Sequence, residues 1–359
     1  MSNALTMANL DDPYPAYAQR VAVAPFARDE ELGMWVAASA AAVRAVLADE
    51  RLQVRPMGEP IPAPLIGTPL GALFGRLARM NDGPRHRVLR GRLAEVLRWC
   101  DDDRLVHGAT TRTDALLAAH PACDGTLLTR LATEVPAAAV AGLLGLEADP
   151  ELAGDVGAVV RGFTANDARA IACGSAAAQR LDARVRSRWR EENVVANVIG
   201  MFTQTYDATA GLIGASVAAL ANDAALRALV ATDPASAQRV VREVARWDPP
   251  VQHTRRFVVR DIEIAGRALR AGETVLVLLA AANRDPSANP DPDRFDHARA
   301  EPVSFTFGTG EHACMGERLA VAIAATAMRR LLHAHAEPTA FPRPMAYRGA
   351  PNLRIPMFA

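Results

Sequence analysis

The residues best suited to chemistry lie together near the C-terminus, in the segment FGTGEHACMG at positions 307–316. Its glycines permit turns with positive φ and a close approach of the backbone to a flat ligand. An apolar helix is predicted from Glu317 to about Leu332, so Cys314 lies where backbone N–H groups and the helix dipole favour a thiolate. A thiolate in apolar surroundings is a good ligand for haem iron. The alternative is a tight turn that carries a buried, structural cysteine.

This segment resembles the cysteine loop of the cytochrome P450 family at every position of the pattern F-G-x-G-x-H-x-C-x-G. The resemblance implies that Cys314 ligates the iron of a haem b. It also implies a mainly α fold with small β sheets, with the haem between a long central helix and the cysteine loop. The other cofactor-binding residues implied in this loop are Phe307, Gly308, His312 and Gly316, of which His312 contacts a haem propionate.

Composition narrows the class of protein. The chain has 359 residues, is 50% hydrophobic, and carries 40 basic and 40 acidic residues. A formal net charge of zero argues against binding nucleic acid through bulk electrostatics. The four cysteines are scattered, which suggests neither a disulfide framework nor a zinc site. Without a visible signal peptide or an unbroken membrane-length apolar run, we expect a cytoplasmic monomer of the soluble bacterial type.

The domain organisation implied by the resemblance is a single domain over residues 1–359. Its helix-rich core covers about 80–250 and 312–335, and its β-rich parts cover about 30–60, 255–280 and 340–359. The N-terminal order fits this scheme, because a helix opens near Asp12–Tyr17, a strand covers Gly33–Ala37, and Ser39 caps a helix over Ala40–Leu47. Five prolines make Pro56–Pro69 a loop.

A basic pair marks the start of the next helix. His86 and Arg90 are four residues apart and therefore share a helix face. This pair matches the family's H-x-x-x-R motif, which implies binding of a haem propionate. A solvated basic helix face is the alternative.

The region from Asp101 to about Arg190 is predicted to be helical and broken by Pro121, Pro136 and Pro150. It is short for the family, and we expect the helix pair that covers the substrate pocket to be reduced. A reduced lid suggests an open pocket, or a large or carrier-bound substrate.

One long, apolar helix is predicted over Asn193–Asn222. Its centre resembles the family helix that crosses the haem face and carries A-G-x-(D/E)-T, where an acid and an alcohol relay protons during oxygen activation. Asp207 stands at the acid position, but Ala208 replaces the threonine, and Gln204 and Thr205 replace the small pair. Both Gln204 and Thr205 share a face with Ala208 and could supply the missing hydrogen bond. The substrate's own hydroxyl is a third possibility.

This departure affects the expected mechanism. Ordinary, well-coupled monooxygenation is put in doubt, and peroxide-driven oxidation, substrate-assisted protonation or a non-hydroxylating oxidation gain weight. Hydrogen bonding between helices in the core is the alternative reading of these polar side chains.

Downstream, Glu243 and Arg246 match the family's E-x-x-R, and Arg294 matches the third member of that buried, structural ion-pair network. By resemblance, Arg256 is a second propionate ligand, while Val251, Gln252 and Thr254 face the substrate. His253 is either substrate-facing or exposed.

The remaining C-terminal segments are read as β structure. Strands are expected over Asp261–Ile264 and Thr274–Leu279, and a final hairpin over Tyr347–Pro356. By resemblance, the tip of this hairpin around 350–352 contacts substrate.

The resemblance implies a ferredoxin- or flavodoxin-type electron donor. A basic patch on the cysteine side could bind it, composed of Arg85, Arg87, Arg92, Arg98, Arg318, Arg329 and Arg330. The expected function is a monooxygenase that oxidises a small organic, natural-product-type molecule in secondary metabolism. The alternative from another class is a degenerate haem- or ligand-binding module that recruits another protein.

Overall fold

The computed structural model describes residues 3–221, 223–335, 342–349 and 352–359. Helices dominate it, and the strands form small sheets, which confirms the predicted mainly α architecture. The helices are α1 Tyr14–Val23, α2 Ala40–Ala48, α3 Pro69–Arg76, α4 Gly83–Arg98, α5 Asp102–Ala119, α6 Gly125–Leu144, α7 Leu152–Thr164, α8 Ala168–Arg186, α9 Glu192–Leu220, α10 Ala224–Thr232, α11 Pro234–Trp247, α12 Leu279–Asn283 and α13 Glu317–Ala334. The strands are β1 Phe26–Asp29, β2 Met34–Ala37, β3 Leu52–Gln53, β4 Thr254–Val258, β5 Ile262–Ile264, β6 Arg267–Leu269, β7 Thr274–Val277, β8 Pro344–Gly349 and β9 Arg354–Phe358.

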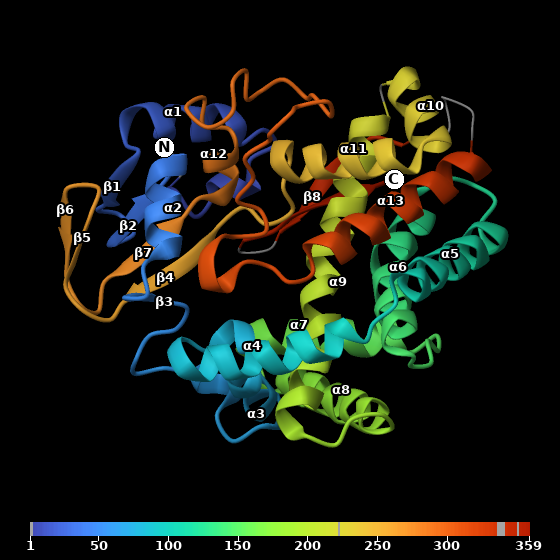
Figure 1. Ribbon diagram of the computed structural model, residues 1–359, viewed down its shortest axis with the longest axis horizontal. Coiled ribbons are helices and arrows are strands. Elements are labelled where there is room, and N and C mark those ends of the chain that lie inside the picture. The colour runs from blue at the N-terminus through green and yellow to red at the C-terminus, as the bar shows by residue number, and fades with distance from the viewer. Residues whose placement is uncertain (1–2, 222, 336–341, 350–351) are drawn as a thin grey trace.

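The main sheet has the strand order β1-β2-β7-β4-β3, in which only β2 and β7 run parallel. It lies on one side of the molecule with α1, α2 and α12, as Figure 1 shows. The other helices form the larger part, and α9 runs through its middle. Two hairpins, β5-β6 and β8-β9, complete the β structure. The predicted C-terminal hairpin is therefore present, whereas the predicted contact of its tip falls partly on residues 350–351, outside the described ranges.

Local signals explain several helix starts. The Ser39 side chain accepts the Ala42 N–H at 3.2 Å and caps α2 as predicted. Asp124 accepts the Leu127 N–H at 2.9 Å and caps α6 in the same way. Each cap satisfies an N–H group that the first helical turn leaves without a partner.

α6 corrects one expectation. Pro136 lies inside this helix and does not break it; the ring removes one backbone N–H, but tertiary packing of the surrounding buried residues holds the helix together. Over the part of the chain that the structure describes, α6 alone is long and apolar enough to cross a membrane by length and composition. Because 67% of the relevant stretch is buried in the fold, the apolar character is that of a core helix.

The helix pair α7 and α8 is present and joined by the short link 165–167. The two helices meet where Gly162 and Gly174 face each other, with a Leu70 methyl group of α3 beside both. A Cβ added at Gly174 would lie only 2.9 Å from that methyl group and 3.1 Å from the Gly162 Cα. Because Gly162 and Gly174 have no side chains, α3, α7 and α8 can pack closely.

Candidate functional site

The cysteine loop is held in a defined shape between the short helix Gly310–His312 and α13. The Cys314 N–H donates to the Phe307 carbonyl at 2.7 Å and closes the loop. Gly308 and Gly310 have φ of 69° and 70°, in the region where other residues are strained. A Cβ at Gly310 would lie 3.1 Å from the Leu47 carbonyl oxygen, so the loop also packs directly on α2.

The Cys314 sulfur has the surroundings of a metal ligand. The Gly316 N–H donates to Sγ at 3.3 Å. Burial raises the pKa of the Cys314 thiol, which corrects the expectation that its position alone favours a thiolate; this N–H and the charge of Arg90 oppose the shift. The residue nevertheless keeps accessible surface. The Cys314 side chain is thus surrounded by protein and yet accessible, as expected beside an internal space. A cation bound there would remove the proton of the thiol.

The centre of α9 also carries accessible side chains. The helix is buried over 195–203 and again over 209–217, but residues 204–208 are exposed or half-exposed. An accessible window in the middle of a buried helix indicates a cavity at this point. The window coincides with the segment predicted to cross the haem face.

Hydrogen bonds distinguish the two candidates for the missing threonine. The Thr205 hydroxyl donates to the Met201 carbonyl at 2.7 Å, which uses its single proton. Gln204 Nε2 donates to the Gly200 carbonyl at 2.9 Å, but the amide keeps a second N–H and its carbonyl oxygen. Gln204 therefore retains groups that can orient a water or a substrate.

Asp207 forms an ion pair that the sequence did not predict. Arg348 of β8 contacts its carboxylate at 2.5 Å. The adjacent Tyr206 hydroxyl is hydrogen-bonded to Arg161 of α7; burial and Asp207 raise the pKa of this tyrosine. Arg161 and Arg348 oppose that shift. The acid at the relay position is thus restrained by a strand almost at the end of the chain.

The structure brings His86 and His312 together, with ring centroids 4.1 Å apart. His86 contacts the carbonyls of Ala78 at 2.9 Å and Glu311 at 3.0 Å, while His312 Nε2 lies 3.1 Å from an Asp82 carboxylate oxygen. A neutral imidazole has one N–H and can donate to only one of two carbonyls. Both histidines therefore also tie α4 to the cysteine loop.

Arg256 is a buried cation, only 7% exposed. Burial lowers its pKa, and the charge of Asp82 opposes the shift. Its guanidinium donates to the Arg255 carbonyl at 2.8 Å, and no carboxylate forms an ion pair with it among the described residues. A buried cation without a paired carboxylate suits an anionic ligand. Together with the Cys314 sulfur, the charge of Arg90 and the α9 window, these residues fit a haem.

The buried ion-pair network has a different third member from the predicted one. Glu243 and Arg246 form a bidentate pair at 2.7 and 2.8 Å, and Arg246 is fully buried. Arg299, not Arg294, adds a contact to Glu243 at 3.4 Å. Arg294 points outward and pairs with Asp296, because the chain turns after it and only its carbonyl faces the network.

Gln252 does not have the predicted orientation toward substrate. It is fully buried, accepts the Tyr17 hydroxyl at 3.0 Å, and donates to the Pro249 carbonyl at 2.6 Å. His253 is buried, so the exposed alternative is wrong. Val251 and Thr254 are partly exposed, and their contact with substrate remains a prediction.

Asn283 is a positioning residue that sequence reasoning missed. Its side chain accepts the Phe305 N–H at 2.6 Å and donates to the Thr306 hydroxyl at 2.9 Å. Thr306 in turn donates to the Ala245 carbonyl at 2.5 Å. This chain of contacts fixes the cysteine loop to α11. No local sequence pattern links Asn283 to Phe305 and Thr306, which lie 22 and 23 positions away.

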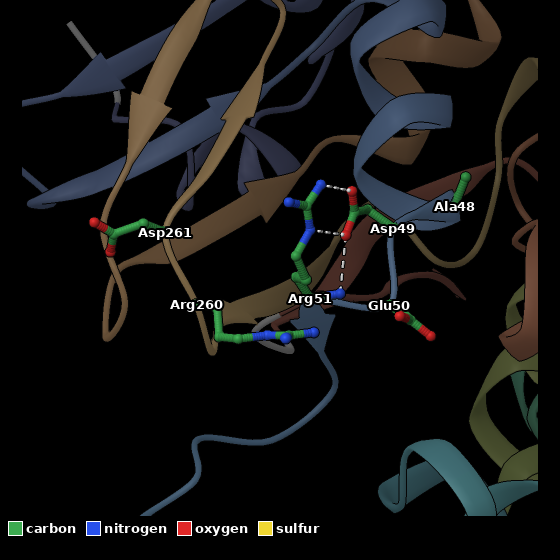
Figure 2. Close-up of a pocket in the computed structure, with 6 residues that line it drawn as sticks. All are labelled: Ala48, Asp49, Glu50, Arg51, Arg260 and Asp261. Atoms are coloured by element: carbon green, nitrogen blue, oxygen red, sulfur yellow. Dashed lines mark hydrogen bonds and ion pairs between the residues drawn. The ribbon is translucent and has the colours of Figure 1, made fainter.

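The cleft in Figure 2 is a separate, charged surface feature of about 540 Å³. It lies between the end of α2 and the turn that precedes β5. Within it, Arg51 pairs with Asp49 at 2.8 Å. It contains no thiol or predicted site residue, so we assign the site to the space between Cys314 and α9.

Comparisons with known proteins agree with this geometry. The family model described as Cytochrome P450 matches residues 236–336. Cytochrome P450 monooxygenase PikC of Streptomyces venezuelae is 30% identical over 358 aligned positions, covering 89% of this chain and 83% of PikC. The chain therefore belongs to the cytochrome P450 family. This membership implies a haem cofactor.

Two further relatives show how the similarity is distributed. The crystal structure of CalO2 matches with a TM-score of 0.79 and 28% identity, over 99% of this chain and 96% of CalO2, which confirms the P450 fold. The 6-deoxyerythronolide B hydroxylase of Saccharopolyspora erythraea is 40% identical over 126 residues, or 35% of this chain. That match spans only 31% of the hydroxylase.

Proposed function

We propose that this protein is a haem-thiolate monooxygenase that oxidises a small organic substrate of the natural-product type. The observation that carries the proposal is the position of Cys314, whose sulfur accepts a backbone N–H and faces an enclosed space. The monooxygenase and hydroxylase names of PikC and the S. erythraea relative support the reaction class.

The roles of this chain's residues follow from their surroundings. Cys314 would ligate the iron, Arg256 and Arg90 would pair with the propionates, and His86 and His312 would fix the loop beside them. When bound, the haem supplies the oxygen-activating chemistry. The protein excludes water, orients substrate and holds protons at Asp207 and in the window of α9.

The unusual feature of the proposed site is Ala208. We assign the lost hydrogen bond to Gln204, because Thr205 already uses its only proton within the helix. The Asp207 carboxylate must separate from Arg348 before it can accept or donate a proton. Opening of this ion pair is therefore a proposed step of the catalytic cycle. Substrate-assisted protonation and use of peroxide are the alternatives that Ala208 favours.

A ferredoxin- or flavodoxin-type donor is the proposed electron source, but the predicted basic patch is partly neutralised. Four of its arginines contact acids of this chain: Arg87 with Glu311, Arg92 with Glu95, Arg318 with Asp102 and Arg330 with Asp114. We therefore expect only a modest fall in turnover with ionic strength. A cytoplasmic monomer and, for a large substrate, delivery on a carrier remain part of the proposal.

Product analysis with isotopically labelled dioxygen tests the monooxygenase proposal. The purified holoprotein is supplied with a surrogate ferredoxin system and a panel of macrolide-like and aromatic substrates. Incorporation of one labelled oxygen atom into product supports the proposal. Label found only in water, with product formed only from added peroxide, contradicts it and favours the peroxide alternative; haem binding without any turnover favours the recruitment module.

A further inference from the structure

Arg79 is a cation that neither the predicted site nor the network above uses. It lies in the short helix Ala78–Met80, immediately before α4. The backbone beside it is firmly held, because the Ala78 N–H donates to Asn197 Oδ1 at 2.7 Å and the Ala78 carbonyl contacts His86 at 2.9 Å.

Among the described residues, the Arg79 side chain has no partner. Within the described ranges, its guanidinium makes neither an ion pair nor a hydrogen bond, although it keeps accessible surface. Desolvation by the surrounding protein lowers the pKa of Arg79 to about 10. A cation that lacks an acidic partner and is partly withdrawn from water is stabilised by an anionic ligand.

The position of this segment places Arg79 beside the α9 window. Asn197 contacts Ala78, and Gly200 lies so close to Leu77 that a Cβ there would be 2.8 Å from a Leu77 methyl group. Gln204 is the next residue along this face of α9, one turn beyond Gly200, and it opens the accessible window. The segment that carries Arg79 therefore packs against α9 within one turn of Gln204.

We propose that Arg79 binds a carboxylate of the substrate and thereby fixes which end of the molecule faces the centre of α9. This inference rests on the proposed function, since it places the substrate in the haem cavity. A guanidinium can hold a carboxylate through two parallel hydrogen bonds, which fixes orientation as well as position. A haem propionate is the other source of a carboxylate, but Arg256 and Arg90 already provide two cations for its two propionates.

Binding titrations of the holoprotein test the proposal. Dodecanoate and phenylbutyrate are each compared with the neutral alcohol of the same skeleton, and binding is followed by the change in the haem absorption spectrum. Wild type should bind each carboxylate more tightly than its alcohol. Arg79→Gln should weaken carboxylate binding by roughly tenfold to a hundredfold and leave alcohol binding unchanged. Arg79→Lys should retain part of the preference, because lysine keeps the positive charge but lacks the two parallel N–H donors of the guanidinium.

Arg242→Gln is the matched control, since Arg242 is an exposed arginine on α11 with no acidic partner in the described structure. It should bind both ligands as wild type does. Equal binding of carboxylate and alcohol by wild type, or an equal loss of both in Arg79→Gln, would overturn the proposal. So would faster haem transfer to apomyoglobin with unchanged carboxylate preference, which would assign Arg79 to the haem. Failure of the proposed function would be recognised separately, because the reduced wild-type protein with carbon monoxide would then lack the Soret band of a thiolate-ligated haem.

Discussion

Arg299 folds back over its own turn to reach Glu243 and makes four contacts there, one to this carboxylate and three to backbone carbonyls. Besides the 3.4 Å contact to Glu243, it donates to the carbonyls of Pro290, Asp291 and Arg294 at 2.6 to 3.0 Å. It therefore holds together the segment that leads into the cysteine loop. Arg294, with 68% of its side chain exposed, has no such role.

Substitutions at these two arginines should differ in their effect on stability. Arg299→Gln should lower the free energy of unfolding by about 1.5–3 kcal/mol, because charge-assisted hydrogen bonds to a buried carboxylate and to carbonyls are lost. Arg294→Gln should change it by less than about 0.5 kcal/mol, since an exposed ion pair is screened. Urea titration of both holoproteins measures the difference. A larger loss of unfolding free energy in Arg294→Gln than in Arg299→Gln would show that Arg294 is the third member of the network, as the sequence predicted.

At Gln204 and Thr205 the structure separates two residues that the sequence left equal. Gln204→Leu removes the free amide and should reduce product formed per dioxygen consumed by on the order of tenfold to a hundredfold. Thr205→Val should have a small effect, because the hydroxyl already donates within the helix. Dioxygen uptake and product yield are measured together. The reverse order would show that Thr205 turns from Met201 during turnover.

Residue identity and spacing, together with the family resemblance, were sufficient to predict the helix that follows the cysteine loop and the Glu243–Arg246 pair. They were insufficient where a side chain is directed by a distant element. Gln252 turns toward Tyr17, and Asp207 pairs with Arg348, 141 positions away. Arg79 carried no motif at all. Local patterns contain no information about such partners, because tertiary packing selects them.

At the scale of elements, the contact between α7 and α8 depends on glycine. Gly174→Ala should destabilise the fold by about 1–3 kcal/mol, because the added methyl group meets Leu70, Ala158 and Gly162 at about 3 Å. Gly154→Ala, in α7 with nothing within 4 Å of the new Cβ, should instead stabilise it by about 0.5–1 kcal/mol. Thermal unfolding of the two variants gives the comparison. Equal shifts would mean that α7 and α8 separate readily in solution.

The predicted elements were most reliable where apolar periodicity was long, as in α9 and α13. They were less reliable in short or exceptional segments. α3 was missed beside a proline-rich loop, although Thr68 accepts the Gly71 N–H at 3.1 Å and caps it. The strand β6 was also missed, because three residues are too few for a pattern.

For the whole molecule, we propose a single domain, with α9 connecting its parts. α9 packs on α6, α13 and the C-terminal strand β9, so the helical part and the end of the chain share one core. Haem absorbance and far-ultraviolet circular dichroism should therefore change in one coincident urea transition. Two separated transitions, with the sheet unfolding first, would show that the β-rich part is an independent unit.

The most direct test of the central claim is the absorption spectrum of the reduced holoprotein with carbon monoxide. If Cys314 is the iron ligand, wild type gives the Soret band of a thiolate-ligated haem, and Cys314→Ser loses that band while Cys173→Ser, at an exposed position on α8, retains it. A histidine-type band in wild type, or a thiolate band that survives in Cys314→Ser, would contradict the assignment of Cys314 and the function built on it.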